Sequence, residues 1–299
     1  MKIKTVTIGI PAYNEGRNIV RLISSVLNQK MFNFKITKII VSSDGSSDNT
    51  VLSIKNMKNK MIEIYDNKDR KGIARGLNQI IENSTSDILV TLDADIIVKD
   101  KDFIQNLVNP IIKDNIDHTS SAILDIDNKT YFSHILSNSM KLKEILFDSI
   151  NGGDNVYNCH GLARGYSRKF YKDISFPSSI GNDIYTYLVS VKNGYSFKYV
   201  KNAIAYYVLP SNLNDHFKQS SRFFSSGLII ENYFDADFVK KEIRISALDY
   251  LKAFLMSMPI LLKNPIKSLT YFLIQLCVYL KVLVKVTNKQ AWDLAYSTK

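Results

Sequence analysis

Short apolar strands alternate with amphipathic helices through the first hundred residues, and this alternation limits the fold more than any other feature. Strands are expected at residues 6–10, 36–41, 62–65 and 88–92. Helices are expected at residues 19–27, from 50 onward and at 72–82. This spacing is typical of a parallel, doubly wound sheet, whose strand-end loops meet at one edge where ligands bind. We therefore predict an α/β fold with a mostly parallel central sheet flanked by helices.

The strand expected at residues 88–92 runs directly into two carboxylates, Asp93 and Asp95. Two acidic groups at such a position suit a hard divalent cation, and the cation suits a diphosphate. The spacing alone is a weak signal, because it occurs again at Asp125 and at Asp235. Polar loop residues that simply end the strand are the alternative interpretation.

Four segments of the first hundred residues carry a resemblance to a known family. Their sequences are PAYNE at 11–15, SDGSSDNT at 43–50, GIARGLN at 72–78 and LDAD at 92–95. In this order they resemble the successive signatures of family-2 glycosyltransferases with the GT-A fold. The resemblance implies an enzyme, a hexosyltransferase that takes a sugar from a nucleoside-diphosphate donor.

The resemblance also implies a donor site. Asp95 would contact Mg²⁺ or Mn²⁺ directly, with Asp93 at the ribose or at the metal's hydration shell. Many members carry an acid where this chain has Ser43. The sequence therefore does not decide the nucleotide base of the sugar donor, although a UDP-sugar is favoured. The residues implied to contact the nucleotide are Pro11, Ala12, Tyr13, Glu15, Asp44 and Lys71.

Asp183 precedes an expected helix with Leu188 and Val191 on its buried face. One interpretation is a helix N-cap. The resemblance gives another, because an acid–Asp pair at this position carries the catalytic base of inverting members. Asn182 replaces the first acid, which leaves the role to Asp183. A carboxylate suits it, since the acceptor hydroxyl loses its proton only as the bond to the sugar forms. One base and one metal imply single displacement with inversion.

The middle of the chain is expected to form the acceptor side. A helix starting at Phe103 should break near Pro110, and residues 131–147 should form a helix or a mobile segment. Strands are expected at 121–124, 197–200 and 203–208. In the family, the strand near His160 and Gly161 forms the floor of the sugar and acceptor site. Alternatively, His160 only hydrogen-bonds within the fold.

A second resemblance lies at Gln219, Arg222 and Phe223. This spacing is similar to the Gln-x-x-Arg-Trp motif of the processive synthases of cellulose, chitin and hyaluronan, with Phe in place of Trp. The implied roles are Gln219 and Arg222 on the donor and Phe223 against the acceptor. The alternative is an amphipathic helix with a solvated arginine.

The C-terminal segment is basic and apolar. Residues 240–299 hold ten Lys/Arg and three Asp/Glu, against a net charge of +11 for the chain. The apolar runs at 253–262 and 269–280 are shorter than the roughly 20 residues of a spanning helix. We expect interfacial helices on a membrane, although packing on the catalytic domain, a homo-oligomer or a tilted hairpin remain alternatives. The predicted domains are 1–235, divided into nucleotide-binding (1–98) and acceptor-binding (99–235) halves, and a tail at 236–299.

The predicted protein is an inverting, metal-dependent glycosyltransferase at the cytoplasmic face of the cell membrane, acting on a lipid-linked or polysaccharide acceptor. Its attachment would be peripheral or monotopic, and the protein would be cytoplasmic if the tail packs on the core. A polyprenyl-phosphate glycosyltransferase is the alternative, and it would not need Arg222. A nucleotidyltransferase that makes the sugar donor would usually open with a Gly-rich, basic phosphate loop, and the start of this sequence has none. A nucleic-acid-binding protein lacks support because no motif interleaves basic and aromatic residues. Intact Asp93, Asp95 and Asp183 argue against a non-catalytic scaffold.

Overall fold

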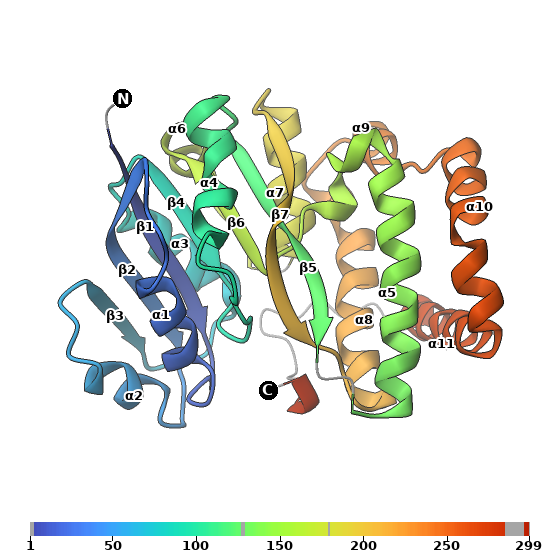
Figure 1. The fold of residues 1–299 in the computed structure, drawn as a ribbon, viewed down its shortest axis with the longest axis horizontal. Coiled ribbons are helices and arrows are strands. Elements are labelled where there is room, and N and C mark those ends of the chain that lie inside the picture. Colours follow the sequence, from blue (N-terminus) through green and yellow to red (C-terminus); the bar gives the residue numbers. More distant parts are fainter. Residues whose placement is uncertain (1–2, 127–128, 179, 285–295, 299) are drawn as a thin grey trace. The chain divides into compact units, whose positions relative to one another are not determined.

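The computed structural model describes residues 3–126, 129–178, 180–284 and 296–298 (Figure 1). The chain forms two compact units. Residues up to 124 together with 159–207 make the first, here called the sheet unit. Residues 125–158 and 208–298 make the second, here called the helical unit. The predicted boundary between a catalytic domain and a tail at residue 235 stays a prediction.

A seven-stranded sheet forms the centre of the sheet unit, in the order β3-β2-β1-β4-β6-β5-β7. The strands β1 to β4 pair in parallel, whereas β6 runs antiparallel to both β4 and β5. The predicted α/β fold with a mostly parallel sheet is therefore confirmed. The strands are β1 Lys4–Ala12, β2 Phe34–Asp44, β3 Ile62–Asn67, β4 Ile88–Leu92, β5 His118–Ile126, β6 Ala163–Ser167 and β7 Phe197–Val208.

The first strand is longer than predicted, because β1 continues through Pro11 to Ala12. Its pairing with β4 ends at Gly9, opposite Thr91. Beyond that point β1 pairs only with β2, where Pro11 lies opposite Ser42. Proline cannot donate a backbone hydrogen bond, but one side of the strand is already unpaired here, so the ladder tolerates it.

The last strand corrects a second prediction. Residues 197–200 and 203–208 were expected to be separate strands, and they form the single strand β7. The two residues between them, Lys201 and Asn202, are exposed. Because β7 is an edge strand, polar side chains can point to solvent there without breaking the pairing.

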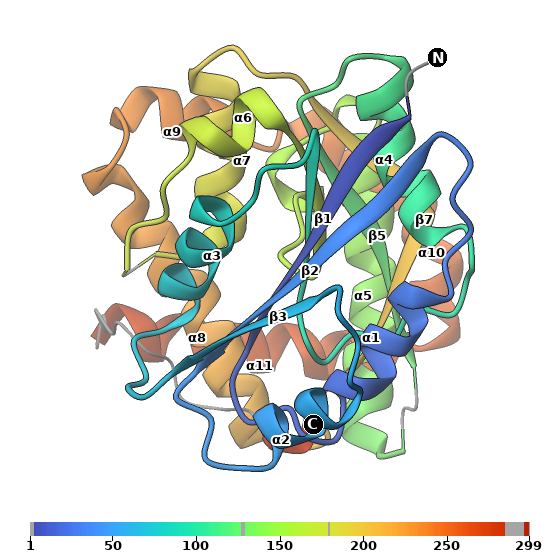
Figure 2. The ribbon, with the colours of Figure 1, turned by 90° about the vertical axis from the view of Figure 1, so that its left-hand side faces the viewer.

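Helices cover both faces of this sheet, with α1 and α4 on one face and α3, α6 and α7 on the other (Figure 2). Each buries one apolar stripe against the strands, as the predicted spacing requires. The helices of the sheet unit are α1 Ile19–Leu27, α2 Thr50–Asn56, α3 Ile73–Glu82, α4 Phe103–Lys113, α6 Arg168–Asp173 and α7 Asn182–Lys192.

The helix α4 does not break at Pro110, contrary to expectation. Proline inside a helix removes one hydrogen bond and is unfavourable by about 3 kcal/mol. Here the helix ends three residues later, and Phe103, Leu107 and Ile111 are buried on the sheet. Burial of each such side chain contributes about 1.5–3 kcal/mol, which outweighs the loss.

The helical unit contains α5 Tyr131–Ser149, α8 Leu213–Ile229, α9 Ala236–Ile243, α10 Ala247–Lys263 and α11 Pro265–Val284, with short 3-10 turns η1 Asn151–Gly153, η2 Val156–Asn158, η3 Ile230–Asn232 and η4 Tyr296–Thr298. Residues 131–147 are thus helical, and the start of α5 is fixed by a capping box. The Thr130 hydroxyl accepts from Ser133 N, and the Ser133 hydroxyl accepts from Thr130 N.

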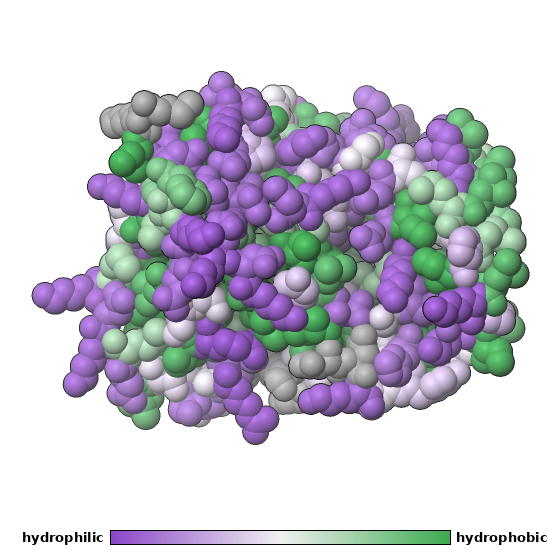
Figure 3. Space-filling view, viewed as in Figure 1, coloured by the Kyte–Doolittle hydropathy of each residue, from purple (hydrophilic) through white to green (hydrophobic). Residues whose placement is uncertain are grey.

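Polar groups lie inside the helical unit, and apolar side chains lie on the surface of α10 and α11. Asn138 Nδ2 donates to Ser268 Oγ at 3.0 Å, and both residues are buried. Apolar residues gather on the outer face of α10 (Figure 3). The large exposed ones of α10 and α11 are Leu248, Tyr250, Leu251, Phe254, Leu255, Met256, Leu262, Ile266, Leu269, Phe272, Leu273, Leu276, Tyr279 and Leu280. Such a surface is typical of a membrane or protein contact.

By length and composition alone, the stretch Ala236–Lys263 passes the test for a helix that could cross a membrane, because an 18-residue window within it has a mean hydropathy of 1.5. The run at 253–262, which by itself is shorter than a spanning helix requires, is part of this longer stretch. The stretch is interrupted between α9 and α10, where Ser246 caps the second helix. Residues 285–295, which belong to the predicted tail, lie outside the described part of the chain.

Candidate active site

The loops that follow β1 and β2 are joined by hydrogen bonds. Glu15 N donates to Thr50 Oγ1 at 2.8 Å, and Ser47 N donates to Asn14 Oδ1 at 2.9 Å. Asn14 has φ 55°, in the left-handed region that asparagine tolerates better than most residues. A Cβ on Gly16 would lie 1.9 Å from Asn49 Oδ1, so a larger residue would require the Asn49 side chain to move. The two predicted nucleotide-binding loops therefore form one surface.

The residues predicted after β1 differ in accessibility. Pro11 and Tyr13 are half-buried, whereas Ala12 and Glu15 are buried. The Glu15 carboxylate accepts from Asn18 Nδ2 at 2.9 Å, which ties it to the start of α1. The guanidinium of Arg70 lies 4.0 Å from the centre of the Tyr13 ring. Sequence reasoning did not select Arg70, although it precedes the predicted Lys71.

Asp44 is buried at the end of β2 and binds backbone groups of a second loop. Its Oδ1 accepts from Lys71 N at 2.8 Å and its Oδ2 accepts from Gly72 N at 2.7 Å. Gly72 has φ 91° and begins α3, a conformation that glycine adopts readily. Asp44 was predicted to contact the base. The structure adds an internal role, since Asp44 fixes the Lys71 backbone while the Lys71 side chain is exposed.

Asp93 and Asp95 occupy the turn directly after β4, at the carboxyl edge of the parallel strands. Asp93 N donates to Leu162 O at 2.8 Å, and Ile96 N donates to Asp93 O at 3.4 Å, so the turn is held by its backbone. Both aspartates are half-buried. No group of three or more His, Cys, Asp or Glu able to hold a metal occurs among the described residues.

The other two Asp-x-Asp sequences have different surroundings. Asp235 caps α9, where its side chain accepts from Asp237 N and Phe238 N. Asp125 lies within β5, and Asp127 lies outside the described residues. Of the described carboxylates in these three sequences, only Asp93 and Asp95 follow a central parallel strand.

Asp183 lies in the first turn of α7, where it is half-buried. The N-cap residue is Gly181, so the interpretation of Asp183 as an N-cap is wrong. Its Oδ1 accepts from Ile184 N at 2.9 Å, and its backbone carbonyl accepts from Cys159 Sγ at 3.5 Å. An acid in the first turn also suits the positive end of the helix dipole.

His160 and Gly161 lie beside this turn in the sheet unit. A Cβ on Gly161 would lie 3.2 Å from Asn182 Oδ1 and 4.0 Å from Asp183 Cβ. His160 N donates to Ser120 Oγ at 2.9 Å, and its half-buried ring meets Tyr199 edge-on at 6.3 Å. Gly161 therefore adjoins Asp183, and its place on the acceptor side stays a prediction.

Gln219, Arg222 and Phe223 lie on α8 in the helical unit. Gln219 and Arg222 are half-buried, and the Phe223 ring is 61% exposed. His216, one turn before Gln219, is buried. Burial lowers the pKa of His216 to about 4, and the positive charge of Lys143 acts in the same direction.

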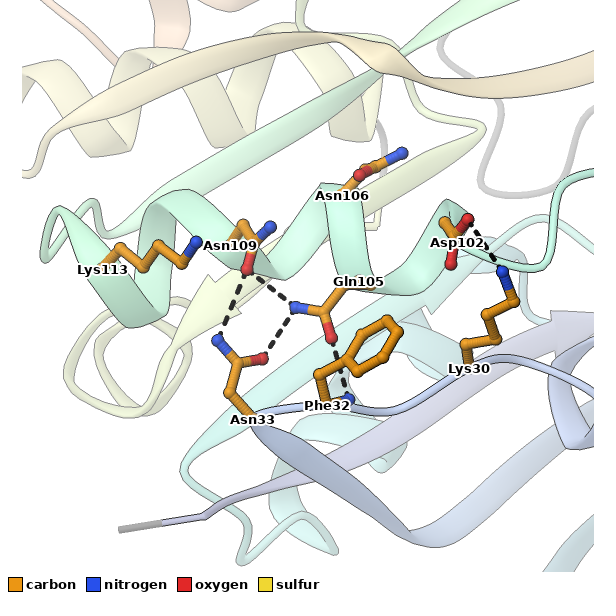
Figure 4. Close-up of a pocket in the computed structure, with 8 residues that line it drawn as sticks. All are labelled: Lys30, Phe32, Asn33, Asp102, Gln105, Asn106, Asn109 and Lys113. Carbon is orange, nitrogen blue, oxygen red and sulfur yellow. Dashed lines mark hydrogen bonds and ion pairs between the residues drawn. The ribbon is translucent and has the colours of Figure 1, made fainter. Parts of the chain in front are cut away.

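A cavity of about 540 Å³ lies elsewhere in the sheet unit, between α4 and the loop before β2 (Figure 4). No residue predicted for the active site lines it. Gln105 Nε2 donates to Asn33 Oδ1 and to Asn109 Oδ1, each at 2.7 Å. The side-chain amides that line the cavity thus largely hydrogen-bond to one another. We assign it no part in the chemistry. Its lining residues are Lys30, Phe32, Asn33, Asp102, Gln105, Asn106, Asn109 and Lys113.

Solved structures share this fold, that of the GT-A glycosyltransferases. A mannosyltransferase from Pyrobaculum calidifontis, in complex with GDP-Man and Mn²⁺, matches 96% of this chain and 77% of its own with a TM-score of 0.63 and 14% identity. A glucosyl-3-phosphoglycerate synthase from Mycobacterium tuberculosis, in complex with Mn²⁺, UDP and phosphoglyceric acid, matches 76% of this chain and 78% of its own, with a TM-score of 0.54 and 16% identity. These similarities show that the chain has the GT-A fold.

The family follows from the sequence match. Residues 7–175 match the model of glycosyl transferase family 2, and the chain belongs to this family. A poly-β-1,6-N-acetyl-D-glucosamine synthase of Staphylococcus epidermidis is 26% identical over 93% of this chain and 65% of its own length. The corresponding synthase of Staphylococcus aureus strain COL is 27% identical over 78% of this chain and 57% of its own. The chain thus spans less than two thirds of the length of these relatives.

Proposed function

We propose that this family-2 glycosyltransferase moves a sugar, with inversion, from a UDP-sugar to a hydroxyl of a growing polysaccharide or lipid-linked acceptor. The observation that carries the proposal is the turn at Asp93 and Asp95, directly after a central parallel strand. The synthases of N-acetylglucosamine polymers among the relatives support a polysaccharide product. We take N-acetylglucosamine as the first sugar to test.

Donor binding is assigned to the joined loops after β1 and β2 and to the turn after β4. Half-buried Tyr13 offers a ring for stacking on the base, and the Asp44 oxygens can each accept one further bond beyond those from Lys71 and Gly72. The Lys71 side chain, which is exposed, is available to phosphate. The remaining donor contacts are assigned to Pro11, Ala12 and Glu15.

A divalent cation fits the chemistry of the Asp93–Asp95 turn. Its backbone is fixed by Leu162, and two half-buried carboxylates provide the hard oxygen ligands that Mg²⁺ and Mn²⁺ prefer. Two carboxylates leave room for diphosphate oxygens, which agrees with the lack of a third acidic ligand among the described residues. When bound, the cation would neutralise charge that develops on the leaving diphosphate.

Asp183 is the proposed catalytic base. Its carboxylate is half-buried in the first turn of α7, next to Gly161. The acceptor hydroxyl would give its proton to this carboxylate as the new glycosidic bond forms and the bond from the sugar to the nucleoside diphosphate breaks. A single displacement of this kind inverts the anomeric centre. His160 and Gly161 would contact the acceptor.

Gln219, Arg222 and Phe223 support repeated transfer to one polymer, through their resemblance to the motif of processive synthases. An arginine suits a diphosphate, and an exposed aromatic ring suits a sugar. A polyprenyl-phosphate glycosyltransferase is the alternative. It would need none of these three side chains, so their substitution separates the two functions.

Membrane attachment is assigned to α10 and α11. An interfacial helix should carry a polar face toward water, yet both helices expose large apolar side chains over most of their surface. We therefore favour insertion at the cytoplasmic face over surface binding. Leu255→Lys should abolish binding to vesicles of anionic lipid, since lysine is unfavourable in the acyl region. Leu52→Lys on α2 is the control, because Leu52 and Leu255 are both 60% exposed.

A thermal-shift screen of nucleoside diphosphates, with and without Mn²⁺, tests the proposed donor site. Stabilisation by UDP that requires Mn²⁺ is expected, at about 2.7 kcal/mol when UDP is 100-fold above its Kd. Stabilisation by another base would change the donor but keep the enzyme class. No stabilisation by any nucleoside diphosphate would contradict the proposed site.

A further inference from the structure

Arg164 is a charged side chain in the interior of the sheet unit. It lies on β6, opposite Thr91 of β4 and Ser120 of β5, and is only 1% exposed. A buried guanidinium is unfavourable unless it is well hydrogen-bonded. No carboxylate among the described residues forms an ion pair with it. Neutral groups must therefore hold this charge in place.

The side-chain hydrogen bonds of Arg164 to the described residues go to the first five residues of α7. Nη1 donates to Asn182 O at 3.0 Å and to Thr186 Oγ1 at 2.9 Å, and Nη2 donates to Asn182 Oδ1 at 3.1 Å. Nε has no partner among the described residues. The planar guanidinium thus binds the backbone and the side chain of Asn182 at the same time, a geometry that an ammonium group cannot reproduce.

The turn held by Arg164 carries Asp183. Asn182 precedes it directly, and the Thr186 hydroxyl also donates to Asn182 O. Cys159 Sγ contacts Asp183 O from the loop before β6, and Gly161 lies close to Asn182, since a Cβ on Gly161 would be 3.2 Å from Asn182 Oδ1. The start of α7 is therefore held from two directions, by Cys159 at the Asp183 carbonyl and by Arg164, which makes three hydrogen bonds to Asn182 and Thr186.

The charge of Arg164 also acts on the carboxylates of the proposed site. Burial alone would lower the pKa of the guanidinium, but Tyr166, Cys159, Asp183 and Asp93 raise it, and the net effect is upward. The guanidinium therefore stays charged and attracts the acids of both the proposed base and the proposed metal turn.

We propose that Arg164 is a positioning residue for sugar transfer, which holds the first turn of α7 so that the Asp183 carboxylate meets the acceptor hydroxyl. The proposal rests on the proposed role of Asp183 as the base. A merely space-filling role would be served as well by an apolar side chain, because buried charges can often be replaced by apolar groups without loss of stability.

The test measures UDP release from UDP-GlcNAc with Mn²⁺ and a β-1,6-linked GlcNAc oligosaccharide, using the full chain. The variants are Arg164→Lys, Arg164→Met and Asn182→Ala, with Asp183→Asn run in parallel. Arg168→Met is the matched control, because Arg168 is exposed on α6. If the wild type does not accept UDP-GlcNAc, the nucleotide sugar that gave the largest thermal shift replaces it.

We expect kcat to fall roughly 10- to 100-fold in all three variants, with the KM for the donor within about threefold of the wild type. Lysine should not restore kcat, since it cannot hold both Asn182 acceptors. Wild-type kcat in Arg164→Lys or Asn182→Ala, with Asp183→Asn inactive, would overturn the proposal and leave the base intact. Full transfer by Asp183→Asn would instead overturn the proposed base. If Arg164→Met does not fold, the kcat values of Arg164→Lys and Asn182→Ala decide whether the proposal holds.

Discussion

Asp44 Oδ1 accepts a hydrogen bond from the backbone N–H of Lys71 at 2.8 Å, and this contact joins the end of β2 to the start of α3. The second carboxylate oxygen of Asp44 accepts from the next residue at 2.7 Å. Asp44 and Lys71 are both predicted to bind the donor and are distant in the sequence. The buried carboxylate of Asp44 thus holds them together. The shape of the proposed donor site depends on this contact.

Asp44→Asn should destabilise the protein by about 1–3 kcal/mol, because the amide NH₂ would face a backbone N–H and leave it unsatisfied. The same variant should weaken the Mn²⁺-dependent thermal shift with UDP. Chemical denaturation and the thermal shift measure the two effects. Asp66→Asn, an exposed residue on β3, is the control and should change neither. Unchanged stability of Asp44→Asn would contradict the structural role.

Asp95→Ala should remove the part of the UDP thermal shift that requires Mn²⁺, because one of two proposed metal-binding carboxylates is lost. At 100-fold excess over Kd this part corresponds to about 2.7 kcal/mol. Titration calorimetry with Mn²⁺ and UDP gives the affinity directly. Asp100→Asn, exposed in the loop after β4, should bind as the wild type does. Equal Mn²⁺ dependence in Asp95→Ala would rule out the assignment.

His216 should make stability depend on pH. Its folded pKa is lowered to about 4 by burial and by Lys143, so between pH 6.5 and 4 the unfolded chain binds more protons than the folded chain. The stabilisation is present above pH 6.5 and is lost as the pH falls toward 4. The free energy of unfolding should therefore fall by on the order of 2 kcal/mol between pH 7 and pH 5. His216→Gln should flatten this dependence in urea unfolding, whereas His134→Gln, which is exposed on α5, should not.

Phe223→Ala should shorten the polymer product without lowering stability, because its ring is 61% exposed. The resemblance to processive synthases further implies that Phe223→Trp keeps or lengthens the product. Chromatography of the product measures its length. Phe32→Ala removes a ring that is 74% exposed in the sheet unit and serves as the control. An unchanged product length in Phe223→Ala would favour the single-transfer alternative.

The sequence predicted the parallel part of the sheet because local signals agree there. Ile40 and Val90 lie in continuous apolar runs, and buried parallel strands favour such runs. The Asp93–Asp95 turn followed from its place after one of these strands. The break expected at Pro110 was wrong because helix propensity does not include the stability gained when the helix around Pro110 is buried on the sheet. The break expected within β7 was wrong because the exposed edge position of Lys201 depends on the order of strands.

The contacts of Arg164 could not be predicted, because they join segments that come together only in the folded chain. An arginine in a short strand is usually read as a surface residue. Its burial becomes visible only when β6 is placed between β4 and β5. The polar interior of the helical unit was missed for a related reason. On α10 and α11 most of the large apolar side chains are exposed, whereas Ser257 and Ser268 are buried, and this distribution depends on how the helices pack.

Asp183→Asn tests the central claim most directly, because it removes the proposed base while keeping the size of the side chain. Donor binding, measured by calorimetry with UDP and Mn²⁺, should stay within about threefold of the wild type. Transfer, measured as UDP release in the presence of acceptor, should fall by roughly 10²- to 10⁴-fold, as expected when a general base is lost. Asp100→Asn should behave as the wild type in both assays. Transfer at the wild-type rate in Asp183→Asn would contradict the account.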